Sequence, residues 1–108
     1  MIIPSIVTFI SDELEKDFNK LSDNDFVKKS IRNAITELKQ NAFCGIQIPK
    51  RIIPPEYIQK YAVKNLWKYD MPKGWRLIYT VTADNEVELI SAILEWFDHK
   101  DYERRFKY

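Results

Sequence analysis

A chain of 108 residues is long enough for one hydrophobic core but not for two, so we expect a single domain over residues 1–108. Hydrophobic residues make up 45% of the chain and aromatic residues 14%, which excludes a disordered polar chain. The net charge of +1 predicts no polyanionic partner by itself, and the single cysteine excludes an intrachain disulfide and suits a reducing cytoplasm.

The N-terminal part of the chain predicts a strand and a short helix. Residues 5–10 are rich in branched side chains and predict the strand. Ser11 is a favourable N-cap, and two acidic residues follow it in the first turn, where the helix dipole favours them. The apolar residues of this helix are spaced four and three apart: Leu14, Phe18 and Leu21. The first residues lack a basic leader and a long apolar run, so we expect neither a signal peptide nor a membrane segment.

A longer amphipathic helix is predicted next. The polar segment 22–25 ends the first helix and caps the second. The apolar positions of the second helix follow a helical period: Val27, Ile31, Ile35, Leu38 and Ala42. Gly45 is expected to end this helix, and Cys44 is expected to be a small buried apolar side chain. Because the loop between the helices is short, we expect an antiparallel helical hairpin.

Three prolines shape the segment between residues 45 and 65. Pro49, Pro54 and Pro55 exclude a continuous helix and a central strand. Pro55 is a favourable first residue for a short helix over residues 56–61. The secondary structure of the rest of the segment is ambiguous from the sequence.

From Leu66 onward the pattern alternates and predicts a β-hairpin. Residues 71–75 resemble a three-residue loop, in which Pro72 opens a type I turn and Gly74 takes the left-handed conformation. The register implies an apolar face with the pairs Met71–Trp75, Tyr69–Leu77 and Trp67–Tyr79, and an opposite face with the pairs Lys68–Ile78 and Asp70–Arg76.

A third strand completes the predicted sheet. Asp84-Asn85 is a good two-residue turn into a strand over residues 86–94. We therefore expect an α+β fold. Its small antiparallel sheet would comprise the N-terminal strand plus a three-stranded meander, with the helical hairpin packed on one face.

The chain contains no phosphate-binding loop, nucleophile elbow or metal motif. His99 is the only histidine and lacks a second histidine or cysteine partner, so we expect no metal and no cofactor. Charge is segregated: residues 45–76 carry seven lysines and arginines against two acids, and residues 99–108 carry four against two. Folding could gather these two basic blocks on one face, and the alternative is ordinary solvated surface.

These residues could perform RNA cleavage through the ribose 2′-hydroxyl. That reaction needs a base, an acid and fixed positive charge for the phosphorane-like transition state. His99 and Tyr102 are the candidates for proton transfer. The candidate cations, which could hold phosphate, are Lys68, Lys73, Arg76, Lys100, Arg104 and Arg105.

Each candidate also has a structural alternative. His99 could anchor the chain end after the last strand, and Arg76 could simply pair with Asp70 across the hairpin. Tyr102 and Phe106, four residues apart, fit an apolar stripe on a terminal helical turn. The lysines could be solvated surface residues, and the three tryptophans could be core residues rather than platforms for base stacking.

Three segments resemble the RelE/ParE superfamily of toxin–antitoxin toxins, and more narrowly its RelE-like branch. They are residues 65–72, residues 74–79 with the sequence Gly-Trp-Arg-Leu-Ile-Tyr, and residues 95–102. The resemblance covers roughly residues 46–108. It implies a small antiparallel sheet with a helical hairpin. It also implies a cytoplasmic, metal-independent endoribonuclease that cleaves mRNA on the ribosome, inhibits translation and is neutralised by a cognate antitoxin.

The resemblance also implies roles for particular residues. Arg76 matches the arginine that family members use on the strand after the hairpin, and Lys68 lies close to a catalytic lysine position. His99, Lys100 and Tyr102 lie in the C-terminal region that supplies the remaining base, cation and tyrosine. Tyr69 and Asp70 stand where strongly ribonucleolytic members carry basic residues. The alternative is therefore a non-catalytic ParE-like toxin or interaction module that binds a protein target such as a topoisomerase.

Overall fold

The structure of the chain, a computed structural model, describes residues 2–83 and 88–106. Within these residues it contains a five-stranded sheet, four α-helices and two short 3₁₀ turns. The elements in chain order are β1 (Ile6–Phe9), α1 (Asp12–Lys20), α2 (Phe26–Gln40), β2 (Ile46–Gln47), η1 (Lys50–Ile52), α3 (Pro55–Tyr61), β3 (Trp67–Asp70), η2 (Pro72–Gly74), β4 (Arg76–Ala83), β5 (Leu89–Phe97) and α4 (His99–Arg105). The expected α+β class is confirmed.

The sheet is mixed rather than wholly antiparallel. Its strand order is β1-β5-β4-β3-β2, and β1 runs parallel to β5 while every other neighbouring pair is antiparallel. A parallel pair requires a long connection between its strands, and here most of the chain separates β1 from β5. The short fifth strand β2 was not expected, because its two residues fall in the proline-rich segment.

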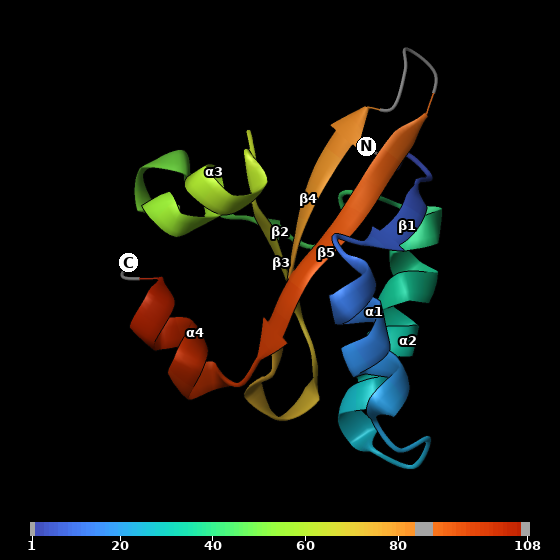
Figure 1. Ribbon diagram of the computed structural model, residues 1–108. Coiled ribbons are helices and arrows are strands. Elements are labelled where there is room, and N and C mark those ends of the chain that lie inside the picture. Colours follow the sequence, from blue (N-terminus) through green and yellow to red (C-terminus); the bar gives the residue numbers. More distant parts are fainter. Residues whose placement is uncertain (1, 84–87, 107–108) are drawn as a thin grey trace.

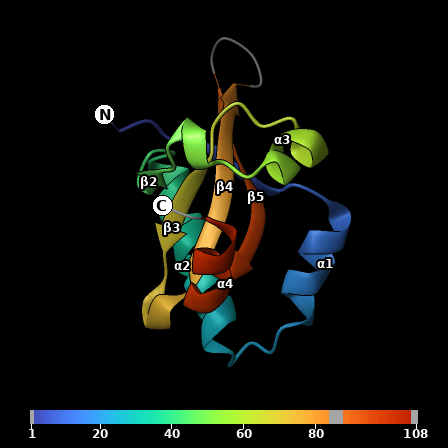
Figure 2. The same ribbon diagram turned by 90° about the vertical axis from the view of Figure 1, so that its left-hand side faces the viewer.

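Helices cover both faces of the sheet (Figure 1). The predicted hairpin of α1 and α2 packs on one face, and α3 and α4 lie on the other, as the view in Figure 2 also shows. Each face has its own hydrophobic core. One includes Ile31, Leu38 and Tyr79 beneath α1 and α2, and the other includes Ile78 and Phe106 beneath α3 and α4. The sequence predicted a helical layer on one face only, so the layer formed by α3 and α4 was not expected.

The N-terminal helices begin where the sequence predicts. The Ser11 side chain accepts a hydrogen bond from the backbone N–H of Leu14 at 3.1 Å, and Asp25 accepts one from Val27 at 2.8 Å. Helix α2, however, ends at Gln40, so the prediction that Gly45 ends it is wrong. The C-cap is an extended Asn41, whose backbone N–H still bonds back to the helix, and no left-handed residue is needed.

Gly45 is required for a close approach instead. Its backbone N–H donates to the Tyr79 hydroxyl at 3.1 Å, and this hydroxyl donates to the Ala42 carbonyl at 3.0 Å. A Cβ added at Gly45 would lie 2.5 Å from the backbone oxygen of Lys68 and 2.7 Å from the Tyr79 hydroxyl oxygen. The glycine therefore allows the end of the helical hairpin to lie directly against strand β3.

We expect Gly45→Ala to lower the free energy of unfolding by about 1–3 kcal/mol, the usual cost of overpacking. The obstructing Lys68 carbonyl belongs to the backbone of a paired strand and cannot rotate away. Urea denaturation would measure the change. Ala62→Gly is a control of opposite sign, because Ala62 has a left-handed φ of 54° that glycine adopts without strain. Unchanged stability in Gly45→Ala would contradict the proposed close approach.

The β3–β4 hairpin has the predicted register. Trp67 pairs with Tyr79, Tyr69 with Leu77, and Asp70 with Arg76, as do Lys68 and Ile78. A hydrogen bond of 2.8 Å from the Met71 N–H to the Trp75 carbonyl closes the loop. Gly74 has the expected positive φ of 80°, and Lys73 also has a positive φ, of 62°.

Strand β5 differs from the prediction in its end and in its regularity. It runs to Phe97, three residues beyond the predicted end at residue 94, while the predicted turn at Asp84-Asn85 lies outside the described residues. Ile78 pairs with Glu95 but Tyr79 pairs with Ile93, so Leu94 is an extra residue in β5. The bulge turns both Leu94 and Glu95 toward the layer of α3 and α4.

The three tryptophans are partly buried, but the cysteine is not. The tryptophans Trp67, Trp75 and Trp96 are partly buried against the core beneath α1 and α2, in agreement with a packing role. Cys44 is exposed, so the expectation of a buried thiol is wrong. It follows the helix in a turn, and the neighbouring Ala42 fills the core position.

Among the described residues, no helix is long and apolar enough to cross a membrane.

Candidate functional site

Three of the four predicted catalytic residues meet on the sheet face that α3 and α4 cover. Lys68 comes from β3, Arg76 from β4 and Tyr102 from α4. The Lys68 ammonium lies 5.1 Å from the centre of the Tyr102 ring, and the Arg76 guanidinium carbon lies 5.6 Å from it. Both cations are therefore within the range of a cation–π interaction with one aromatic ring. The hairpin register explains the meeting, because it places both cations on the same face.

Asp70 is the carboxylate shared by these two cations. Its Oδ1 atom lies 2.9 Å from Arg76 Nε and 3.6 Å from Lys68 Nζ. The side chains of both cations are only 16% exposed, whereas that of Asp70 is 47% exposed. Two cations and one carboxylate leave one positive charge in a largely desolvated position, where a bound anion would interact strongly with it.

The Arg76 guanidinium does not use all of its hydrogen-bond donors. One terminal nitrogen, NH1, donates to the Trp75 carbonyl at 3.2 Å. The Nε atom, although close to Asp70, is buried and has no aligned hydrogen bond to any described residue. Arginine carries five N–H donors in a planar fork, so this side chain retains capacity for a further acceptor.

Tyr102 is a buried platform beneath the cations. It is 4% exposed, and its ring stacks on Phe106 with 4.9 Å between the ring centres. Phe97 packs against the same ring at 6.3 Å. This arrangement agrees with the apolar stripe that the sequence offered as an alternative. The role of Tyr102 in proton transfer stays a prediction.

His99 lies at the start of α4, beside the tip of the hairpin. A Cβ added at Gly74 would lie 3.1 Å from the Cβ of His99, so the histidine contacts the loop that leads to Arg76. Its Nε2 atom is 2.8 Å from a carboxylate oxygen of Glu103, one helical turn away, and its side chain is 53% exposed. The sequence signal for this pair is the four-residue spacing, which the sequence interpretation did not use.

The structure separates the four predicted nucleic-acid-binding residues. Lys73 points its ammonium at the ring of Phe26 on α2, at 4.4 Å, and Lys100 is exposed in the first turn of α4. Arg104 and Arg105 instead line a cavity together with residues of η1 and α3. Arg105 forms an ion pair with Glu95 and lies over the Phe97 ring, with 4.8 Å from its guanidinium carbon to the ring centre.

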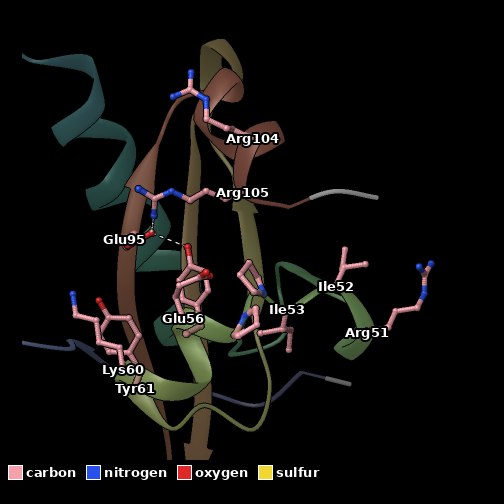
Figure 3. Close-up of a pocket in the computed structure, with 12 residues that line it drawn as sticks. Arg51, Ile52, Ile53, Glu56, Lys60, Tyr61, Glu95, Arg104 and Arg105 are labelled. Carbon is pink, nitrogen blue, oxygen red and sulfur yellow. Dashed lines mark hydrogen bonds and ion pairs between the residues drawn. The ribbon is translucent and has the colours of Figure 1, made fainter.

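This cavity, of about 730 Å³, lies between η1, α3 and α4 (Figure 3). Its cations are Arg51, Lys60, Arg104 and Arg105, and its carboxylates are Glu56 and Glu95. The Tyr57 hydroxyl donates to Glu95 at 2.7 Å. Burial, and then this hydrogen bond, raise the pKa of Tyr57, so the hydroxyl remains a donor.

The sequence interpretation did not identify this cavity. Its available signals were the basic block of residues 45–76 and the helix that Pro55 opens. Neither signal shows that α3 and α4 lie side by side. Among the described residues, no cluster of histidine, cysteine or carboxylate side chains could hold a metal ion.

Comparison of the chain with protein families, with curated proteins and with solved structures found no match.

Proposed function

We propose that this protein is a RelE-like toxin, a metal-independent endoribonuclease that cleaves mRNA on the ribosome and is neutralised by a cognate antitoxin. The observation that carries the proposal is the pair of largely buried cations, Lys68 and Arg76, over the ring of Tyr102. The resemblance of the hairpin and of residues 95–102 to RelE-like toxins supports it independently.

In the proposed reaction, the ribose 2′-hydroxyl attacks the adjacent phosphorus and the bond from phosphorus to the 5′-oxygen breaks. The products are a 2′,3′-cyclic phosphate and a free 5′-hydroxyl. Arg76 and Lys68 stabilise the charge that develops on the phosphoryl oxygens. His99 transfers protons, since its imidazole is the more exposed of the two candidate groups and has a nitrogen that can accept or donate a proton. Lys100, exposed in the same helical turn, adds positive charge.

Asp70 and Glu103 occupy this site in the free protein. Asp70 is half-exposed, so a phosphate can take its place on Arg76 while the carboxylate turns to solvent. Glu103 is 67% exposed and can release His99 in the same way. In each pair the carboxylate is the more exposed partner, so it regains hydration when it turns to solvent and an RNA phosphate takes its place.

Primer extension on mRNA in a translating extract tests the proposal. The wild-type protein is expected to create new 5′ ends within coding sequence, and these ends should be lost in His99→Ala. Lys39→Ala is the matched control, because Lys39 is an exposed residue on α2, on the opposite face of the sheet. If expression arrests growth while the mRNA stays intact, the ribonuclease proposal is wrong and a protein-binding ParE-like toxin is favoured.

A further inference from the structure

The cavity between α3 and α4 combines an apolar wall with a charged rim. Ile52, Ile53, Pro54 and Tyr61 supply apolar surface. Figure 3 shows Arg105 turned toward Glu95, while Arg51 and Arg104 extend outward at the rim. The volume of about 730 Å³ lies within the usual range for small-molecule sites.

The charges in the cavity are unevenly paired. Glu95 is already engaged by Tyr57 and Arg105. Burial lowers the pKa of Arg105, but its hydrogen bonds with Tyr57 and Glu95 outweigh this effect and raise it overall. Among the described residues, neither Arg51 nor Lys60 forms an ion pair with a carboxylate. The Lys60 ammonium instead lies 5.2 Å from the centre of the Tyr61 ring.

We propose that this cavity binds a nucleotide, with the base against Tyr61 and the phosphate on Lys60, since these two residues lie together at one side of the cavity (Figure 3). Bases stack on aromatic rings, and Lys60 on its flexible stem can move from the ring to the phosphate. The cavity stands apart from the proposed cleavage chemistry, because it is lined by Arg104 and Arg105 and by neither Lys68 nor Arg76.

An acidic peptide fits the same cavity less well. Glu56 and Glu95 lie among its lining residues and would repel carboxylates spread along a peptide, whereas a nucleotide carries its negative charge at one end only. The same carboxylate oxygens can accept hydrogen bonds from the amino and imino groups of a base. The two carboxylates therefore favour a ligand that is anionic at one end and a hydrogen-bond donor at the other, as a nucleotide is.

The nucleotide could be a free mononucleotide or one unit of a single-stranded RNA. Isothermal titration calorimetry distinguishes these sources, with the four 5′-mononucleotides in one arm and 2′-O-methyl tetranucleotides, which cannot be cleaved, in the other. We expect saturable binding at one site per chain. Mononucleotides that bind as tightly as the tetranucleotides identify a free nucleotide as the ligand. Binding of the tetranucleotides alone identifies RNA.

Single substitutions test whether the nucleotide binds in this cavity. Tyr61→Leu is expected to weaken it by roughly five-fold or more, because a base stack is lost. Lys60→Glu should weaken it further, whereas Lys39→Glu, which makes the same charge change on α2, should leave it unchanged. Circular dichroism would verify that each variant folds. The proposal is overturned if no ligand binds saturably, if Lys39→Glu weakens binding as much as Lys60→Glu, or if Arg76→Ala abolishes binding that Lys60→Glu leaves intact.

Discussion

Replacing Arg76 with alanine is expected to lower the rate of mRNA cleavage by about 10²–10³-fold, the usual loss when one donor to the transition state is removed. The guanidinium is largely buried, lies over Tyr102 and retains a buried Nε donor without an aligned hydrogen bond. The guanidinium is held in place by its surroundings, so it can stabilise the phosphoryl oxygens without moving once the phosphate has displaced Asp70. Quantitative primer extension over a dilution series of protein would measure the loss.

Two further variants separate a chemical role from a structural one. Arg76→Lys keeps the charge but removes the planar fork, so we expect an intermediate rate. Asp70→Asn removes the competing carboxylate, and cleavage should be maintained or increased. If Arg76 served only to pair with Asp70, both Arg76→Ala and Asp70→Asn would leave cleavage unchanged. Thermal unfolding of each variant would show whether a lost rate reflects lost folding.

The features that the sequence predicted correctly depend on local geometry. The pairing of Asp70 with Arg76 follows from one loop, since its length determines every pair along the hairpin. The N-caps at Ser11 and Asp25 also follow from neighbouring residues alone. These local rules were enough to place Lys68 and Arg76 on one face, which is the larger part of the candidate site.

The features that the sequence missed depend on contacts between distant segments. The parallel pairing of β1 with β5 joins residues more than 80 positions apart, such as Ile6 and Ile90. The extra residue Leu94 breaks the alternation on which strand prediction rests, and it turns Glu95 toward Tyr57. The cavity exists because α3 and α4 come from separate parts of the chain and dock on the same face, which no local pattern specifies.

Replacing Phe106 with alanine is expected to lower the free energy of unfolding by about 3–5 kcal/mol, as for other fully buried phenylalanines. Phe106 is 1% exposed and stacks on Tyr102 at 4.9 Å and on Tyr57 at 5.6 Å between ring centres. It therefore joins α4 to α3 and to the sheet. Helix α4 has only seven residues and would not persist without this packing. Urea denaturation would measure the loss.

Phe106→Ala also tests whether the core beneath α3 and α4 supports the proposed catalytic residues, because α4 carries both His99 and Tyr102. Hydrogen exchange is expected to show that the amides of Tyr102 and residue 106 lose protection before those of β4. Ile58→Ala is the matched control: Ile58 is a large apolar residue on α3, 51% exposed, and its loss should change stability by about 0.5 kcal/mol or less. If the α4 amides of Phe106→Ala stay as protected as those of β4, the helix does not depend on this ring. The packing of Tyr102 and Phe97 would then be sufficient to hold the platform beneath Lys68 and Arg76.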